Sequence, residues 1–380
     1  MSQSSKSSNI LILSTCFSVQ HVGDMSMKIV ADENLAFTDY FFAEFAEIQH
    51  KAGRTLTHND VKDADALLVR SVTQVNAALI EQSSVQFVGS ATIGTDHLDI
   101  NALEQNNIAW SNAAGCNAQA VAEYVITALL HLDVTLLDRN NDFTLAIVGL
   151  GNVGKRLAAM AQLLGWKVIG YDPFVQLALI ENVTWAELLQ RADAISIHVP
   201  FTRYEAYPTH HLFDETAFSQ MKPAAILINS ARGAVIKQSA LMDDIKQTKR
   251  QVVLDVFEFE PEISEQLLDV LALATPHIAG YSLEGKARGT QMIYEAFCAK
   301  FRYKAEKGFE SQLPNVTAYF QQQDFKATLK QHLTDIYCIA EDDQALRACV
   351  QQGKVQQHAF DLLRKNYPLR REWAAHGGPK

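Results

Sequence analysis

A glycine-rich turn near the middle of the 380-residue chain limits its possible folds more than any other feature. The pattern G-x-G-x-x-G is formed by Gly149, Gly151 and Gly154. It follows the apolar run 145–148 and opens a stretch with the apolar spacing of a helix. A second apolar run follows and ends at Asp172. This order predicts a β-α-β unit that binds a dinucleotide.

Each part of the motif has a physical task in that interpretation. Gly149 makes the tight turn, Gly151 lets the backbone approach a pyrophosphate, and Gly154 allows the helix to pack closely on the strand. Asn152 and Val153 begin the helix, whose free amides and dipole favour negative charge. We therefore expect both residues to lie at the cofactor.

The residues around Asp172 favour NAD over NADP. Asp172 lies 18 residues after Gly154, near the position that binds ribose hydroxyls, and no arginine directly follows it. An acidic group there repels a 2′-phosphate. A glycine turn without a dinucleotide, and FAD binding, are the alternatives. FAD enzymes usually carry the fingerprint at the extreme N-terminus, whereas here it lies mid-chain.

Apolar runs alternate with helical patterns through most of the chain, which predicts α/β units with parallel sheets. The expected strands are 28–31, 66–70, 87–91 and 108–111 in a first block, and 145–148, 167–171, 194–199, 225–229, 252–256 and one near 273 in a second. The apolar spacing predicts helices over residues 118–132 and 283–300. It predicts a smaller α+β or mostly helical module over residues 305–380.

Composition excludes several classes of protein. Hydrophobic residues make up 48% and charged residues 20%, the balance of a globular protein. A net charge of −10 makes non-specific nucleic-acid binding unfavourable.

The five cysteines show no C-x-x-C spacing, which argues against zinc and against a disulfide framework, and fits a reducing cytoplasm. No run reaches the roughly 18 apolar residues that span a bilayer. Residues 1–26 predict a dispensable extension rather than a signal peptide.

Three segments at the expected carboxyl ends of strands carry candidate catalytic side chains. They contain Arg232, Glu260 and His277. Taken singly, these are an ordinary surface arginine, a solvated acid and a structural histidine. Together they supply what oxidation of a secondary alcohol needs: a base near working pH, a carboxylate that orients it, and a planar cation for a substrate carboxylate.

The chain resembles the D-isomer-specific 2-hydroxyacid dehydrogenases over nearly all of residues 28–300. The matching elements are the glycine motif, Asn229-Ser-Ala-Arg232-Gly233, Asp255-Val-Phe-Glu-Phe-Glu260-Pro261 and Pro276-His277-Ile-Ala-Gly280. The resemblance implies that Arg232 binds the substrate carboxylate and that Glu260 pairs with the acid/base His277. It also places Asp255 at the nicotinamide, with Ala231 and Gly280 among the cofactor contacts.

The resemblance further implies a domain arrangement. We expect a Rossmann NAD domain over 118–278 and a flavodoxin-like substrate domain that is discontinuous, over 27–117 and 279–304. Residues 305–380 would form an α+β dimerisation domain of a homodimer.

Finer matches point to a phosphorylated hydroxy acid as the substrate. Val30-Ala-Asp-Glu-Asn34, Leu68-Val-Arg-Ser71 and His277 to Thr290 are typical of a branch of the family that oxidises 4-phospho-D-erythronate for pyridoxal phosphate synthesis. We expect Arg70, Ser71, Thr92 and Tyr281 to bind this substrate. Lys286 and Arg288 fit an ordinary basic helix start equally well.

Two alternatives stay open at this point. One is another dehydrogenase of the family, acting on 3-phosphoglycerate or hydroxypyruvate. The other is an NAD-sensing interaction protein. No metal is expected, because the neighbouring His210 and His211 have no partner at ligand spacing.

Overall fold

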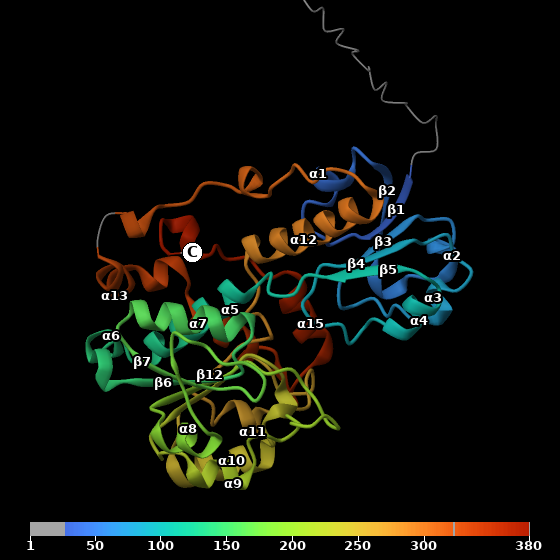
Figure 1. Ribbon diagram of the computed structural model, residues 1–380. Helices are drawn as coiled ribbons and strands as arrows, with labels where there is room; N and C mark the ends of the chain where they lie inside the picture. The colour runs from blue at the N-terminus through green and yellow to red at the C-terminus, as the bar shows by residue number, and fades with distance from the viewer. Residues whose placement is uncertain (1–26, 322–323, 380) are drawn as a thin grey trace, which may run out of the picture.

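The computed structural model describes residues 27–321 and 324–379, so the N-terminal extension and Cys16 lie outside the described residues. Two parallel sheets form the framework, one of five strands and one of seven (Figure 1). The α/β class expected from the alternating pattern is confirmed.

The first sheet has the strand order β2-β1-β3-β4-β5, the 2-1-3-4-5 order of flavodoxin-like folds. Its elements are β1 (Met27–Asp32), α1 (Thr38–Phe42), β2 (Ala46–Lys51), α2 (His58–Val61), β3 (Ala66–Val69), α3 (Ala77–Ile80), β4 (Phe87–Ser90), α4 (Ile100–Gln105) and β5 (Ala109–Asn112). The later helix α12 (Leu283–Phe301) returns to this sheet. Its Ile293, Tyr294 and Phe297 are buried in one cluster with residues of β1, β3 and β4.

The second sheet has the order β12-β11-β10-β9-β6-β7-β8, which is the Rossmann order 3-2-1-4-5-6 with one strand added. Its elements are β6 (Thr144–Val148), α7 (Asn152–Leu163), β7 (Lys167–Tyr171), β8 (Glu181–Asn182), α8 (Trp185–Arg191), β9 (Ala194–Ile197), α9 (Glu215–Gln220), β10 (Ile226–Asn229), α10 (Gln238–Thr248), β11 (Val252–Leu254), α11 (Glu265–Leu268) and β12 (Leu273–Ala274). The order reverses between β6 and β9, which is where such sheets bind ligands. The glycine turn directly follows β6.

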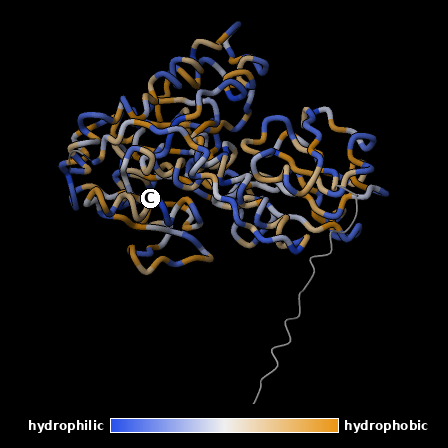
Figure 2. Tube along the Cα trace, turned by 90° about the horizontal axis from the view of Figure 1, so that it is seen from above, coloured by the Kyte–Doolittle hydropathy of each residue, from blue (hydrophilic) through white to orange (hydrophobic). Residues whose placement is uncertain are grey.

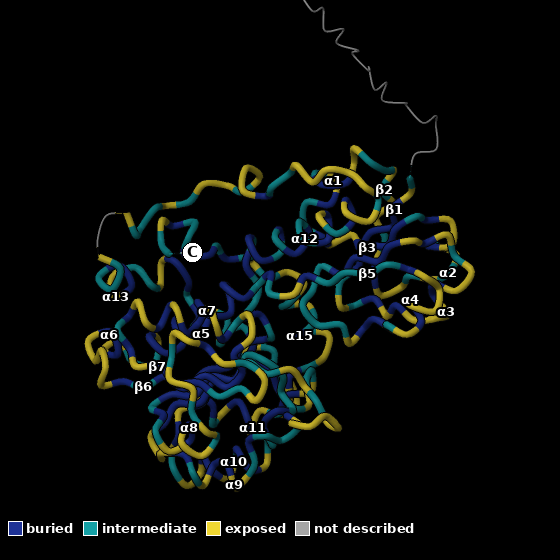
Figure 3. The backbone as a smooth tube through the Cα atoms, in the orientation of Figure 1, coloured by how far each residue is buried: buried dark blue, intermediate teal, exposed yellow. Residues whose placement is uncertain are grey.

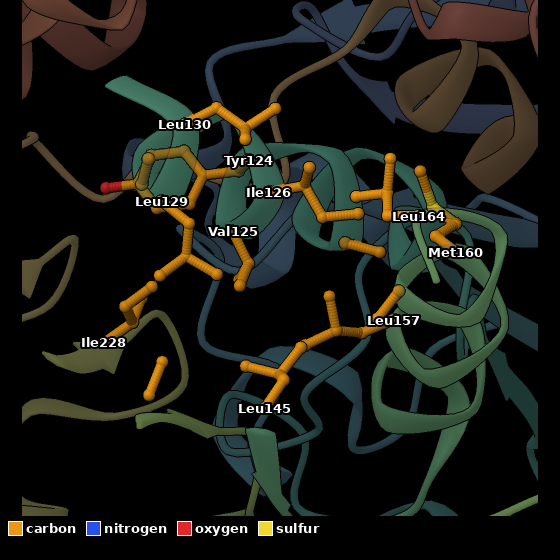
Figure 4. Packing of buried hydrophobic residues seen from close by; sticks show 14 of the residues in the cluster. Tyr124, Val125, Ile126, Leu129, Leu130, Leu145, Leu157, Met160, Leu164 and Ile228 are labelled. Carbon is orange, nitrogen blue, oxygen red and sulfur yellow. The ribbon is translucent and has the colours of Figure 1, made fainter. Parts of the chain in front are cut away.

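A buried helix joins the two sheets. Helix α5 (Ala118–Leu132) precedes the short α6 (Leu136–Arg139) and packs on α7 and β6. Figure 4 shows Val125 and Leu129 of α5 facing Leu145 of β6 and Leu157 of α7. Full burial of each such side chain contributes about 1.5–3 kcal/mol. Figure 3 shows buried stretches along the strands of both sheets and exposed stretches in the outer loops, and Figure 2 shows hydrophobic and hydrophilic residues alternating along the chain.

No single helix among the described residues is long and apolar enough to cross a membrane. The pair Ala118–Leu132 and Leu136–Asp142 passes that test only jointly, and it bends by 100°.

The C-terminal segment contains both helices and a small sheet. Its elements are α13 (Phe325–Ile336), α14 (Ile339–Arg347), β13 (Val350–Gln351), β14 (Lys354–Val355) and α15 (Gln357–Lys365). It packs on both faces of the second sheet. Leu329 and Trp373 join the cluster around α5, whereas Leu346 and Phe360 join the cluster on the opposite face. In Figure 1 the red helix α15 lies between the two α/β units.

Candidate active site

The glycine turn has the shape that a dinucleotide needs. Gly149 adopts a φ of +91°, a backbone conformation that side chains rarely allow. A Cβ on Gly154 would lie 2.1 Å from the carbonyl oxygen of Gly149, so helix α7 approaches the turn as closely as only glycine permits. A Cβ on Gly151 would meet nothing within 4 Å. The space beside Gly151, at the N-terminus of α7, fits a pyrophosphate.

Asp172 follows β7 and holds the glycine turn in place. Its Oδ2 accepts a hydrogen bond of 2.8 Å from the amide of Leu150, and its Oδ1 accepts from the amides of Phe174 and Val175. The carboxylate is partly exposed beside the turn. Its contact with a ribose stays a prediction. At the start of α7, Val153 packs against the core and Asn152 lies beside Gly115.

The three candidate catalytic residues follow three neighbouring strands. Arg232 comes after β10, Glu260 after β11 and His277 after β12. Because these strands are parallel and adjacent, their carboxyl ends meet at one edge of the sheet. This is the edge that also carries the glycine turn.

His277 and Glu260 form a directly hydrogen-bonded pair. His277 Nδ1 lies 2.7 Å from Glu260 Oε1, and the side chains are 32% and 26% exposed. Burial alone would raise the pKa of Glu260, but the charge and hydrogen bond of His277 outweigh it and leave that pKa lowered. The second imidazole nitrogen, Nε2, bonds to no described residue. It is the atom left to exchange a proton with a substrate.

The loop that carries His277 is fixed from the interior by Asp255. His277 has a φ of +57°, in the left-handed region that is unfavourable for most residues. The buried Asp255 carboxylate accepts hydrogen bonds of 2.7 and 2.9 Å from the next two amides, Ile278 and Ala279, and one from the hydroxyl of Thr275. Burial raises the pKa of Asp255 despite these bonds. These contacts give Asp255 a positioning role, and its contact with nicotinamide stays a prediction.

Arg370, from the C-terminal segment, holds the other side of the same loop. Its guanidinium is buried and donates to the carbonyl oxygens of Ile278, Ala279 and Tyr281. It also donates to Ala120 of α5. The backbone after His277 is therefore fixed by a carboxylate on its amides and a guanidinium on its carbonyls.

Arg232 lies between the two α/β units. Its side chain is 41% exposed, and its Nη2 lies 3.7 Å from Asp96 in the loop after β4. Its Nη1 donates to the carbonyl of Ala231, whose own amide is held by Asn229. The guanidinium thus faces the first sheet from the edge of the second, at a position suited to a substrate carboxylate.

The predicted substrate residues are distributed around this opening. Arg70 follows β3 and donates through Nε to the buried Asp32, at 3.1 Å, while the adjacent Ser71 is exposed. Thr92 lies in the turn after β4, with its hydroxyl 2.8 Å from Ser90 Oγ. Tyr281 lies four residues after His277, and its hydroxyl is 3.3 Å from Arg364 Nη2.

Gly280 is required for packing. A Cβ there would lie 2.0 Å from the side-chain nitrogen Nδ2 of Asn117, the residue just before α5. The sequence interpretation missed Arg364 and Arg370 altogether. No local motif marks either, because both reach the site through contacts with residues more than 80 positions earlier.

The two adjacent histidines stack on one another, and His211 pairs with Glu258 at 2.6 Å. Within residues 27–321 and 324–379 no group of three potential metal ligands is found. All four cysteines that the structure describes are free thiols.

Comparison with known proteins identifies two matching family models. Residues 130–279 match "D-isomer specific 2-hydroxyacid dehydrogenase, NAD binding domain". Residues 310–376 match a domain of unknown function, DUF3410.

Curated relatives match along almost the whole chain. Erythronate-4-phosphate dehydrogenase of Acinetobacter baumannii is 72% identical over 354 residues, which is 93% of this chain and 100% of the relative. The protein of that name from Psychrobacter cryohalolentis is 44% identical, covering 92% and 98%.

A solved structure supports the fold. Apo D-mandelate dehydrogenase of Rhodotorula graminis superposes with a TM-score of 0.60 at 26% identity. The match covers 94% of that chain but only 72% of this one.

Proposed function

Because the chain belongs to the D-isomer-specific 2-hydroxyacid dehydrogenase family, we propose that it oxidises 4-phospho-D-erythronate at C2. It is an NAD-dependent dehydrogenase. The reaction converts 4-phospho-D-erythronate and NAD⁺ to 3-hydroxy-2-oxo-4-phosphobutanoate, NADH and a proton, a step of pyridoxal phosphate synthesis. The name and the nearly complete coverage of the curated relatives support this substrate over 3-phosphoglycerate or hydroxypyruvate.

The hydrogen-bonded pair of His277 and Glu260 is the observation that carries the proposal. His277 Nε2 takes the proton of the C2 hydroxyl, while Glu260 stabilises the imidazolium that forms. Arg232 holds the substrate carboxylate and fixes C2 beside the imidazole. NAD, when bound, accepts the hydride from C2. The open space at Gly151 and the N-terminus of α7 would hold its pyrophosphate.

Closure of the two α/β units would complete the site. Arg232 and Asp96 approach each other from opposite sides of the opening, and hydride transfer requires that water be excluded from it. A substrate held by both units favours the closed arrangement.

The test is NADH formation, followed by absorbance, with 4-phospho-D-erythronate and 3-phosphoglycerate in parallel. The enzyme is first treated with a 2-oxo acid to reoxidise any bound NADH. We expect turnover with the four-carbon acid. Turnover with 3-phosphoglycerate alone would overturn the substrate, and silence with both would favour an NAD-sensing interaction protein.

We also infer that the protein is a cytoplasmic homodimer that assembles through residues 305–380. The family resemblance supports the dimer, and the free thiols agree with a reducing compartment. Light scattering of the purified full chain would give twice the monomer mass. A monomeric mass at working concentrations would contradict the dimer.

A further inference from the structure

Helix α15 brings a cation from the C-terminal segment to the opening of the active site. Phe360 anchors the helix in the core of the second α/β unit, and Asp361 lies 3.4 Å from Arg54 of the first. One turn further on, Arg364 Nη2 donates to the hydroxyl of Tyr281 at 3.3 Å. Tyr281 belongs to the loop that carries His277, so the guanidinium of Arg364 lies within reach of the reacting groups.

Two further cations gather at the same place. The Lys286 ammonium lies 4.8 Å from the centre of the Tyr281 ring, and the guanidinium carbon of Arg364 lies 5.9 Å from it. Burial, and then the charges of Arg70 and Arg364, lower the pKa of Lys286 to about 8. The fold places Arg70 on the same side, because it ends β3, which pairs with β4, and α12, the helix of Lys286, packs on β4. Arg70, Lys286 and Arg364 therefore form one cluster, which we call the cation cluster.

The cation cluster lacks a matching set of negative charges. In the described part of the chain, the Lys286 ammonium forms no ion pair. The Nε of Arg364 is buried without a hydrogen-bond partner. Arg70 has one acidic partner, the buried Asp32, and contacts it only through Nε. The Arg364 charge also acts on Glu260, but that carboxylate is already paired with His277.

Three neighbouring cations whose N–H groups are not all hydrogen-bonded are suited to bind a dianion. A phosphate monoester carries about 1.5 to 2 negative charges at neutral pH and offers three strong acceptor oxygens. Two guanidinium groups and an ammonium supply matching donors. A carboxylate carries a single charge and already has a candidate partner in Arg232. The two anionic ends of a sugar-acid phosphate thus have separate places.

We propose that Arg70, Lys286 and Arg364 form the phosphate subsite, so that the C-terminal segment contributes a specificity-determining residue to the active site. The inference rests on the proposed function, and it deepens it. It explains how the enzyme distinguishes a phosphorylated acid from the bare hydroxy acid: only the phosphorylated substrate neutralises the cation cluster.

The test compares full-length variants on 4-phospho-D-erythronate and on D-erythronate, which lacks the phosphate. Arg364→Gln and Lys286→Met should each lower kcat/KM for the phosphorylated acid by about 10- to 100-fold, the loss expected for one charge-assisted contact. The loss on D-erythronate should be much smaller, because that acid has no phosphate to contact either cation. Lys365→Ala removes an exposed cation from the same helix and should change neither value. Equal losses on both acids would overturn the subsite.

Inorganic phosphate provides a readout that does not depend on turnover. Calorimetry should show phosphate binding to the wild-type protein that Arg364→Gln and Lys286→Met each weaken at least tenfold. The two variants lie on different helices, so misfolding of one leaves the other informative. If the wild type binds phosphate but does not oxidise 4-phospho-D-erythronate, the proposed function fails and the subsite stands. If phosphate binds equally to the wild type and to both variants, the subsite is wrong.

Discussion

The two ends of the active-site opening are built in different ways. At the reaction end, Arg232, Glu260 and His277 follow three adjacent strands of one parallel sheet, so the fold itself brings them together. At the phosphate end, the cation cluster takes one residue each from the loop after β3, from α12 and from α15. The comparison shows that chemistry here depends on sheet geometry, whereas selectivity depends on how the C-terminal segment packs.

The largest effect should come from His277 itself. Because its φ is +57°, asparagine is a better probe than alanine, since asparagine tolerates the left-handed region. His277→Asn should lower kcat by about 10²- to 10⁴-fold, the usual contribution of a general base. NADH binding, followed by fluorescence, should persist.

His211 offers a matched control for this substitution. It also has a left-handed backbone, with a φ of +55°, and also pairs with a glutamate, at 2.6 Å. His211→Asn should retain near-normal kcat. If both variants lost activity equally, the reaction end would not be centred on His277.

The separation between the two ends is not complete, because Arg370 of the C-terminal segment also supports the loop at the reaction end. Arg370→Met would leave the carbonyl of Ala279 without its donor, and the carbonyl of Ile278 with the Tyr281 amide alone. We expect a fall of about 3 kcal/mol in the free energy of unfolding, measured with urea, since each unsatisfied buried group costs about 1–3 kcal/mol. The kcat of the folded fraction should fall too, because His277 loses its fixed loop.

A substitution of Arg347 distinguishes the loss of stability from the loss of kcat. It also belongs to the C-terminal segment and donates to two carbonyls of the second α/β unit, at Leu268 and Leu271, which lie away from the site. Arg347→Met should lower stability comparably but leave the kcat of the folded protein unchanged. A normal kcat in Arg370→Met as well would confine the C-terminal segment to the phosphate end.

The sequence predicted the strands and the glycine turn around the reaction end, because their signals are local. The structure confirms the strand predicted at 167–171 and the helix predicted at 118–132. The glycine turn also lies between a strand and a helix, as its sequence context predicted. In the two parallel sheets, β2 and β8 escaped prediction, and both are edge strands. β2 alternates partly exposed apolar residues with polar ones, and β8 has only two residues, so neither leaves a long apolar run.

The phosphate end could not be predicted in the same way. Arg70 was proposed as an anion-binding residue because it ends a strand, and Lys286 was ambiguous because basic residues are common at helix starts. Arg364 carries no signal of its own: on an amphipathic helix it looks like an ordinary exposed cation. Only the packing of Phe360, which orients α15, turns Arg364 towards Tyr281. That is tertiary information, and no local pattern contains it.

The smallest expected effect is a pH dependence confined to the phosphate end. Lys286 has a pKa lowered to about 8 by burial and by Arg70 and Arg364, so it is charged below that pH and neutral above it. The ratio of kcat/KM for 4-phospho-D-erythronate to that for D-erythronate should therefore fall as pH rises through about 8. Any effect of pH on the catalytic steps that the two substrates share cancels in the ratio. The fall should reach about tenfold, the value of one charge-assisted contact.

Two variants decide whether Lys286 causes this fall. Lys286→Arg keeps a cation that does not titrate in this range, so the ratio should stay high and level from neutral to alkaline pH. Lys286→Met should give a low, level ratio. If the fall near pH 8 persisted in Lys286→Arg, another group would be titrating. Lys286 would then not be the source of the pH dependence, and the titrating group would have to be sought elsewhere at the phosphate end.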